Sequence, residues 1–407
     1  MQKLHGKYGK TVRTAPDEIS TADTAAIHQI YGPGSRFIKS DWYSVWQGVQ
    51  KTDLFAERNI AVHSNLRRNI SRMYAMSSLT VLEKWLLAFD VIGEVSFSKR
   101  FGYLEAGQDD GTLRRIEIAL QSLAWVGQLP WVFWLDHYLA PYIGHQLGLV
   151  LRHGTIRNFA AREVEARKLR GGTEHSDILG QLFEVQKEKP DQLPDHAIIS
   201  VATANVFAGS DTTAITLRAI VYNLVTHPEC LAKLEKEIEE RKADGRLEFP
   251  IRYAQASDMP YLQAVISESL RLHPAVGMAL PRVVPAGGMT IGKDFIPAGT
   301  IVGANAWVVH RDPEIWGSDA EAFRPERWLK GSKGEMEKYS LAFGGGARSC
   351  IGKNISMMEM SKLIPTLVDQ FSMRLTHPEK GLTQECRWFV KQEGLIMNMY
   401  PKSKSAQ

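Results

Sequence analysis

The sequence predicts a mainly α (α+β) protein, with one large helical domain and a small antiparallel sheet region. The first two-thirds of the chain has a mostly helical hydrophobic pattern. One apolar run, residues 195–227, is long enough for a single helix of about 50 Å. Residues 287–302 place glycine-rich turns between short apolar segments, which is typical of small antiparallel strands. These three observations define the predicted fold class.

The numbers for the whole chain limit the classes of function. The chain has 407 residues, 44% of them hydrophobic, and shows no repeat, low-complexity tract or long linker. Its formal net charge of +4 is too small and too dispersed to predict nucleic-acid binding. The cysteines Cys230, Cys350 and Cys386 include no Cys-x-x-Cys pair, which argues against a disulfide framework or a cysteine-built zinc site. A reducing compartment fits this cysteine usage best.

No segment has the pattern of a targeting signal or a membrane span. Residues 1–10 have no apolar core, so they do not form a signal peptide. No stretch reaches the roughly 18 uninterrupted apolar residues of a membrane helix. Polar residues interrupt the strongest candidate, 123–151, which we interpret as buried helices. Its aromatic residues are expected in the core, with a membrane-facing loop as the alternative: Trp131, Phe133, Trp134 and Tyr138.

A short strand is expected at the start of the chain, from Val12 to Pro16. The long helix comes later, and two prolines mark its limits. Pro194 suits its first turn, and Pro228 lies where it must have ended. Its middle, residues 208–213, reads Ala-Gly-Ser-Asp-Thr-Thr, in which Gly and the hydroxyls weaken the helix. We expect either a kink with satisfied hydroxyls or a locally opened helix that presents an acid and an alcohol to a ligand.

A second helix is expected from Tyr261 to Leu272, capped by Ser257 or Asp258. Within it, Glu268 and Arg271 are three residues apart and share one face. The segment Phe323-Arg-Pro-Glu-Arg-Trp328 adds Arg327 beside an aromatic residue. Since a buried carboxylate needs several charged partners, we expect Glu268 to be held by the two guanidinium groups in a structural ion network.

A glycine-rich loop contains Cys350. Residues 343–352 read Phe-Gly-Gly-Gly-Ala-Arg-Ser-Cys-Ile-Gly and precede a helical run. Consecutive glycines let a backbone approach another group closely, and free N–H groups at a helix N-terminus favour a thiolate. The phosphate-loop spacing fails, because five residues separate Gly346 from Gly352. With no local histidine as base, the pattern favours a metal ligand beside an anionic group over a nucleophile.

These residues resemble one family strongly, the cytochrome P450 haem-thiolate monooxygenases. Four motifs occur in the order of that family: residues 208–213, 268–271, 325–328 and 343–352. The resemblance covers nearly the whole chain, so residues 1–407 are expected to form a single P450 catalytic domain. Fungal members usually have an N-terminal membrane anchor and a proline-rich hinge; neither is expected within residues 1–407, which suggests either a truncated chain or a misassigned start. Residues 39–68 look most like the pisatin-demethylase-like branch.

The resemblance implies a cofactor, haem b (iron protoporphyrin IX), and roles for the residues around it. Cys350 resembles the axial thiolate ligand, a ligand type that favours O–O cleavage. Arg348 and Arg282 resemble contacts to the haem propionates. Arg67 and His63 match a Trp-x-x-x-Arg pair of the family in which His replaces Trp. Haem is therefore expected between the long helix and the Cys350 loop.

The resemblance also implies catalytic residues and a substrate pocket. Asp211 and Thr212 match the acid–alcohol pair that delivers protons during oxygen activation. Phe343, the first residue of the Cys350 loop, belongs to the cofactor-binding set. Trp328 stands where the family usually has Phe, beside Arg327. The expected pocket residues, most of them small or apolar, are Asn205, Phe207, Ala208, Val276, Met278, Trp388 and Phe389.

The implied function is a monooxygenase that inserts one oxygen atom into an apolar or amphipathic small molecule, in fungal secondary metabolism or detoxification. Its partner is expected to be an NADPH-cytochrome reductase, with cytochrome b5 as a further donor, and to dock near Arg68, Arg72 and Lys353. The alternative is a haem-binding protein without oxygenase turnover, against which the Asp211–Thr212 pair argues. We expect a monomer. Its expected location is the endoplasmic reticulum membrane if the full-length protein has an anchor, and the cytoplasm if Met1 is the true start of the protein.

Overall fold

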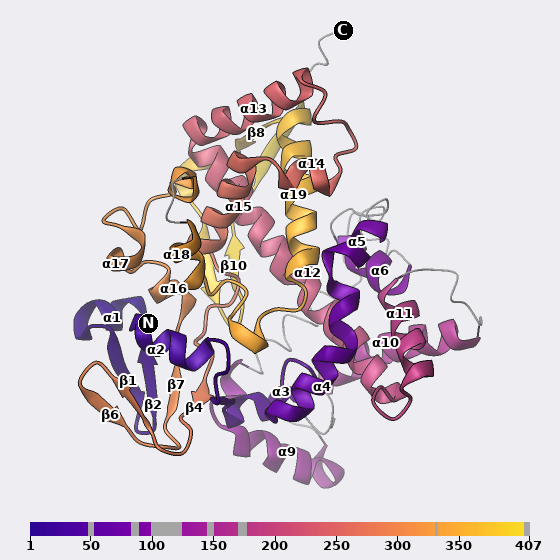
Figure 1. Cartoon of the computed structure of the whole chain (residues 1–407), viewed down its shortest axis with the longest axis vertical. Coiled ribbons are helices and arrows are strands. Elements are labelled where there is room, and N and C mark those ends of the chain that lie inside the picture. Colours follow the sequence, from indigo (N-terminus) through magenta and orange to yellow (C-terminus); the bar gives the residue numbers. More distant parts are fainter. Residues whose placement is uncertain are drawn as a thin grey trace.

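The computed structural model describes residues 1–47, 53–82, 89–98, 124–144, 150–169, 177–329 and 333–402. Over these ranges the protein is mainly helical with small antiparallel sheets, as the sequence predicts. Figure 1 shows α12 (Asp195–Thr226) in the middle of the molecule beside α19 (Lys353–Gln370). The sheet that contains β1 (Thr11–Ala15) and β2 (Glu18–Thr21) lies at the lower left of that view.

The other helices of the described ranges, in chain order, are α1 (Gln2–Tyr8), α2 (Thr24–Tyr31), α3 (Ser44–Gln47), α4 (Ile60–Ile70), α5 (Met76–Leu82), α6 (Phe89–Phe97), α9 (Pro130–Ile143), α10 (Val150–Leu169), α11 (Ile178–Glu188), α13 (Pro228–Ala243), α14 (Tyr253–Ser257), α15 (Pro260–Leu272), α16 (Ala306–Val309), α17 (Pro313–Trp316) and α18 (Lys333–Lys338). The other strands are β3 (Ile38–Lys39), β4 (Arg282–Val283), β5 (Met289–Ile291), β6 (Asp294–Ile296), β7 (Ile301–Gly303), β8 (Phe371–Leu375), β9 (Thr383–Cys386), β10 (Val390–Glu393) and β11 (Met397–Pro401).

A five-stranded sheet joins segments that are far apart in the chain. Its strand order is β1-β2-β7-β4-β3, with β2 and β7 parallel and the other neighbours antiparallel. The strand predicted at Val12–Pro16 is β1, and those predicted within 287–302 are β5, β6 and β7. Lys39 on β3 lies directly opposite Arg282 on β4. The sheet therefore places two basic side chains from distant segments next to each other.

Helix α12 begins and ends within one residue of the predicted limits. It is continuous through residues 208–213, so the predicted local opening does not appear. Ile198 and Val206 on its first half belong to one hydrophobic cluster, whereas Ile220 and Leu224 on its second half belong to another. Helix α12 therefore contributes to two hydrophobic cores, and its polar middle lies among residues of the first, since Phe207 and Ile215 both belong to it.

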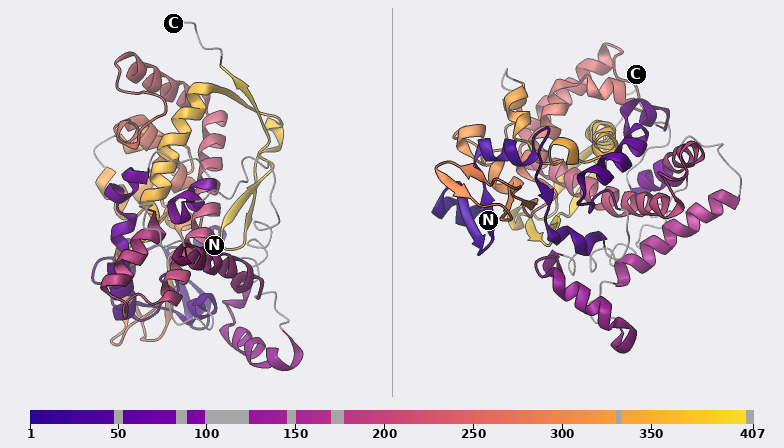
Figure 2. Two further views of the ribbon diagram at one scale, coloured as in Figure 1. Left: turned by 90° about the vertical axis from the view of Figure 1, so that its right-hand side faces the viewer. Right: turned by 60° about the horizontal axis from the view of Figure 1, so that its bottom comes forward.

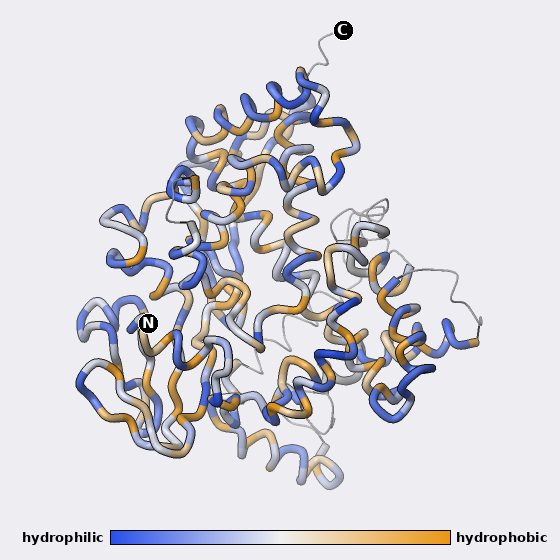
Figure 3. Tube along the Cα trace, in the orientation of Figure 1, coloured by the Kyte–Doolittle hydropathy of each residue, from blue (hydrophilic) through white to orange (hydrophobic). Residues whose placement is uncertain are grey.

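The predicted cap of α15 is wrong, because neither Ser257 nor Asp258 bonds to its first turn. Instead, the backbone N–H groups of Tyr261 and Leu262 each donate to the Glu237 carboxylate of α13, at 2.9 Å. Hydrophilic stretches alternate with hydrophobic ones along α13 in Figure 3, which fits a helix with one buried face. The first turn of α15 is thus capped by a side chain of another helix, and not by a residue next to it in the sequence.

Helix α9 corrects the prediction for the aromatic residues after Pro130. Trp131 and Tyr138 are 62% and 72% exposed, and Trp134 is also exposed, so these three are not core residues. Phe133 is buried, as predicted. The helix projects from the rest of the described protein in both views of Figure 2. Among the helices described, none is both long and apolar enough to cross a membrane.

Candidate active site

The Cys350 loop ends at the N-terminus of α19. The Cys350 N–H donates to the Phe343 carbonyl at 2.8 Å, which closes the loop. The N–H groups of Gly352 and Lys353 bond to the Cys350 sulfur. The thiol is accessible, yet enough protein surrounds it that burial raises its pKa, against the opposing effects of these N–H groups and of Arg67. A metal ion bound to the sulfur would overcome that cost, because coordination deprotonates a thiol.

The glycines of this loop make room for the end of α2. Gly346 has a φ of +54°, in the left-handed region, and a Cβ there would lie 2.3 Å from the Tyr31 carbonyl oxygen. Gly345 is also tight against Tyr31, since its Cβ would lie 3.1 Å from the Cβ of that residue. The expected close approach therefore exists. Its partner is the α2 backbone, so these contacts give the glycines a structural role.

Five basic side chains from four segments converge beside this loop. They lie on β3, α4, β4 and the Cys350 loop, and they are Lys39, His63, Arg67, Arg282 and Arg348. Burial, together with the smaller effects of the other four charges, lowers the pKa of His63 to about 3. Burial and Arg282 similarly lower the pKa of Arg348 to about 10. The cluster is thus electrostatically unfavourable by itself.

The contacts of these cations are mostly to uncharged oxygens. Arg67 donates to the Ser349 carbonyl at 2.7 Å, and Arg348 donates to the Glu57 carbonyl at 2.7 Å. Arg282 donates to the Tyr43 hydroxyl at 3.1 Å. Among the described residues, no Asp or Glu oxygen lies within 4.0 Å of any of the five. Because buried charges require partners, the cluster fits an anion with more than one negative charge.

On α12, the acid–alcohol pair makes two separate contacts. The Thr212 hydroxyl donates to the Ala208 carbonyl at 2.8 Å, one turn earlier. The Asp211 carboxylate lies 3.4 Å from the Lys391 ammonium group of β10. The helix therefore presents a hydroxyl satisfied within its own turn and an acid paired with a basic residue of the C-terminal hairpin. Sequence reasoning had assigned no role to Lys391.

Comparison with known proteins gives a consistent result over almost the whole chain. The family model "Cytochrome P450" matches residues 51–399. The chain belongs to the cytochrome P450 family. It is 40% identical to cytochrome P450 monooxygenase hepC of Aspergillus oryzae, over 98% of this chain and 87% of the relative. It is 36% identical to cytochrome P450 monooxygenase cicH of Emericella nidulans, over 95% of this chain and 85% of the relative. It is 35% identical to pisatin demethylase of Fusarium vanettenii, over 97% of this chain and 82% of the relative.

This P450 is a haem-thiolate monooxygenase, and haem with an axial cysteine is its cofactor. Haem has a metal ion and two carboxylates, which are the two kinds of group that the site requires. The accessible Cys350 sulfur at the start of α19 suits the iron. The basic cluster suits the carboxylates and is joined to the same loop through the Arg67–Ser349 contact. The residues present therefore fit the cofactor of the family.

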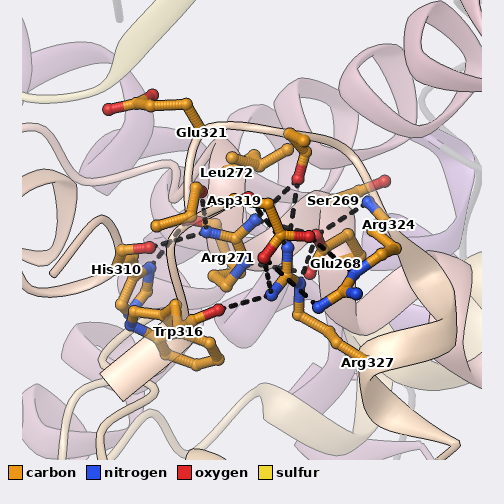
Figure 4. A network of polar contacts seen from close by, with 12 residues as sticks. Glu268, Ser269, Arg271, Leu272, His310, Trp316, Asp319, Glu321, Arg324 and Arg327 are labelled. Carbon is orange, nitrogen blue, oxygen red and sulfur yellow. Dashed lines mark hydrogen bonds and ion pairs between the residues drawn. The ribbon is translucent and has the colours of Figure 1, made fainter. Parts of the chain in front are cut away.

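A buried ion network lies away from this site and is shown in Figure 4. The Arg271 guanidinium donates twice to Glu268, at 2.9 and 2.7 Å, and the Arg327 Nε donates to Glu268 at 2.8 Å. Glu268 and Arg271 are fully buried. Trp328 also donates to Glu268, from its ring N–H at 2.8 Å, a bond that the Phe usual in the family could not make. The sequence did not predict the hydrogen bond from Trp328.

His310 joins this network to the Cys350 loop. Its Nε2 accepts the Leu341 N–H at 2.8 Å, so its Nδ1 bears the proton and donates to the Arg271 carbonyl at 2.8 Å. Burial lowers the pKa of His310 to about 3, which keeps the ring neutral. Leu341 is two residues before Phe343, where the Cys350 loop begins. The network thus helps to position the backbone that leads into the cofactor site.

The expected pocket residues differ in how accessible they are. Ala208 is exposed, Asn205, Val276 and Met278 are half-buried, and Phe207, Trp388 and Phe389 are buried. Trp388 stacks on Trp42 with the ring centroids 4.7 Å apart, as part of an aromatic cluster in the core. The Asn205 amide oxygen accepts the Tyr74 hydroxyl at 2.6 Å. Core packing thus accounts for Trp388, and the pocket assignment of the whole set stays a prediction.

The three basic residues expected to face a reductase are all exposed. Arg68 is on α4, Arg72 follows it, and Lys353 is the first residue of α19. The backbone N–H of Lys353 is one of the two that bond to the Cys350 sulfur, so Lys353 marks the cysteine side of the site. Their docking role stays a prediction.

Proposed function

We propose that Cys350 is the axial ligand of the haem and that Asp211 and Thr212 deliver protons during oxygenation of an apolar or amphipathic small molecule. Bound haem supplies the redox-active iron that activates dioxygen. The observation that supports this placement best is the accessible Cys350 sulfur, which receives two N–H groups at the start of α19 and lies beside a buried cluster of cations.

The roles proposed for the side chains follow from their contacts. Arg67, Arg282, Arg348 and His63 hold the carboxylates of the cofactor. The Thr212 hydroxyl donates a hydrogen bond toward the reacting oxygen, and this requires it to leave the Ala208 carbonyl. Asp211 passes protons to that position from the side of β10, where it meets Lys391. Such general acid–base assistance typically contributes about 10²–10⁴-fold to a rate.

We propose the substrate class from the residues near the middle of α12. Ala208, Val276 and Met278 offer small or apolar surface, which is usual in ligand pockets. Several relatives are fungal cytochrome P450 monooxygenases, and a further relative is pisatin demethylase. A small molecule of fungal secondary metabolism or detoxification is the substrate that these observations support.

We propose an NADPH-cytochrome reductase as electron donor, with cytochrome b5 as a second donor, and a monomeric enzyme formed by residues 1–407 as one catalytic domain. The exposed Arg68, Arg72 and Lys353 support docking at the cysteine side. We further propose a location at the endoplasmic reticulum membrane. The exposed Trp131, Trp134 and Tyr138 of α9 support it, because Trp and Tyr favour the membrane–water interface.

The experiment that tests the function is reconstitution of the purified protein with NADPH and a fungal NADPH-cytochrome reductase. A panel of apolar small molecules is incubated with this system, and the products are measured by mass spectrometry under ¹⁸O₂. We expect at least one product with a single ¹⁸O atom and a strict requirement for NADPH. Haem binding with no oxygenated product from any compound would instead favour the haem-binding protein without turnover.

A further inference from the structure

Lys39 is a buried lysine that neither the motifs nor the family resemblance assigned to the cofactor site. We propose that Lys39 binds a haem carboxylate and forms, together with Arg282, a two-cation clamp across neighbouring strands. This inference rests on the proposed placement of haem against Cys350. It adds a binding residue, contributed by β3, to the set expected from the sequence.

The first argument is the register of the sheet. β3 and β4 are antiparallel, and Lys39 pairs directly with Arg282. Both residues are buried, with 5% and 4% of their surface exposed. Like charges directly opposite each other destabilise a sheet, and burial makes their repulsion stronger. A carboxylate between the two side chains would turn this repulsion into two favourable contacts.

The second argument is what surrounds the Lys39 ammonium group. It donates to the Phe55 carbonyl and lies 4.5 Å from the ring centroid of Tyr43 and 4.7 Å from that of Phe55. Arg282 approaches the same Tyr43, since its guanidinium donates to the hydroxyl and lies 5.7 Å from the ring centroid. The two cations therefore flank one tyrosine. One carbonyl and two rings leave the ammonium group capacity for a further acceptor.

The third argument is that the acids near Lys39 bond elsewhere. Asp53 accepts the Ala56 N–H at 2.9 Å, and Glu57 accepts the Asn59 N–H at 2.6 Å. Neither carboxylate lies within 4.0 Å of Lys39. Burial, Arg282 and Arg348 lower the pKa of Lys39, and a bound carboxylate would oppose that shift. The charge of Lys39 is thus best satisfied by an external anion.

The test compares two cofactors in the purified protein: haem b and its dimethyl ester, in which both carboxylates are neutral. The rate of haem transfer to excess apomyoglobin is measured for the wild type, Lys39→Met, Lys39→Gln and Lys39→Arg. Lys39→Gln removes the charge and keeps a donor for the Phe55 carbonyl. Lys293→Met, an exposed lysine between β5 and β6, is the control for the loss of one positive charge.

We expect Lys39→Met and Lys39→Gln to lose haem b about tenfold faster than the wild type, because losing one member of a charged contact mainly raises the dissociation rate. Lys39→Arg and Lys293→Met should lose it at nearly the wild-type rate. With the dimethyl ester, the wild type and both uncharged variants should lose the cofactor equally fast.

Two results would overturn the proposal: uncharged variants that retain haem b as well as the wild type, or variants that lose both cofactors faster by the same factor. The second result would mean that Lys39 only stabilises the segment around Phe55 and does not bind a haem carboxylate. A wild-type protein that binds haem without a thiolate-type spectrum would instead refute the placement against Cys350, so the two failures are distinguishable.

Discussion

At the scale of single residues, Thr212 has the role that follows most directly from chemistry. Its hydroxyl donates to the Ala208 carbonyl in this structure. Since Thr in a helix populates two χ1 rotamers, the hydroxyl can turn from the carbonyl to another acceptor at low cost. A proton donor with two accessible positions is what the proposed step requires.

We predict that Thr212→Ala binds haem and substrate normally and still oxidises NADPH, but releases mostly hydrogen peroxide. The reason is that protons are no longer delivered in the position that leads to O–O cleavage. The measurement is product formed, and peroxide released, per NADPH oxidised.

Thr216→Ala is the matched control, because the Thr216 hydroxyl also donates one turn back, to the Thr212 carbonyl at 3.0 Å, and is buried. Its product yield should stay near the wild-type value. An unchanged yield in Thr212→Ala would remove Thr212 from the mechanism and leave the hydroxyl a purely structural role.

At the scale of elements, the Glu268 network joins α15 to the segment before α18. Trp328 is the informative position, because its ring N–H replaces a Phe of the usual family motif and donates to a buried carboxylate. We predict that Trp328→Phe lowers the free energy of unfolding by about 1.5–3 kcal/mol, the usual contribution of a hydrogen bond to a charged group. Urea unfolding of the haem-loaded protein measures it.

Trp316→Phe is the comparison, because the ring N–H of Trp316 donates to the neutral Val309 carbonyl at 2.8 Å and the residue is equally buried. Its cost should be smaller, about 0.5–1.5 kcal/mol. Equal costs for the two variants would show that the charge of Glu268 adds nothing to the Trp328 bond.

The elements also show what the sequence could predict. Prolines fix the limits of α12 and α15 locally, and both helices were predicted within one residue. The cap of α15 was not predictable, because the Glu237 carboxylate that bonds its first turn comes from α13. Lys39 was missed for the same reason. β3 has only two residues, and its register against β4 depends on the folded sheet.

The site shows the same division between local and tertiary information. Local motifs were enough to predict Cys350, Glu268 and Arg271, because the spacing of the residues within each motif identifies it. The exposure of Trp131 and Tyr138 was not predictable, since an apolar helix pattern does not say whether another element covers it. The burial of Trp388 likewise depends on Trp42, which lies at the other end of the chain.

At the scale of the whole molecule, buried neutral histidines make the stability depend on pH. Burial lowers the pKa of His310 from 6.5 to about 3, so the unfolded chain binds more protons than the folded protein at mildly acid pH. The contribution of His310 to stability is therefore complete above pH 6.5 and is lost as the pH falls toward 3. Between pH 7.5 and 5.0 this loss is about 2 kcal/mol.

The matching prediction concerns His310→Asn, which keeps a donor for the Arg271 carbonyl but cannot be protonated. It should be less stable than the wild type at pH 7.5, and this difference should shrink by about 2 kcal/mol at pH 5.0. Urea unfolding at both pH values measures the difference. A constant difference for His310→Asn would contradict the buried, neutral state of this ring.

The surface around the cysteine side gives a prediction for electron transfer. Charge reversal at Arg68, Arg72 and Lys353 should slow reduction by the reductase and leave peroxide-supported turnover unchanged, because rim charges act mainly on association rate. Stopped-flow reduction at two salt concentrations measures this. Lys236→Glu, an exposed position on α13, is the control. Equal losses in both assays would indicate misfolding and not a docking defect.

The central claim is that the Cys350 thiolate is the axial ligand of the haem. The most direct measurement is the reduced carbon monoxide difference spectrum of the wild type beside Cys350→Ala, with Cys230→Ala and Cys386→Ala as controls. We predict the red-shifted Soret band of a thiolate-ligated haem in the wild type and both controls, and its loss in Cys350→Ala whether or not haem is retained. A Cys350→Ala protein that keeps this band would contradict the assignment.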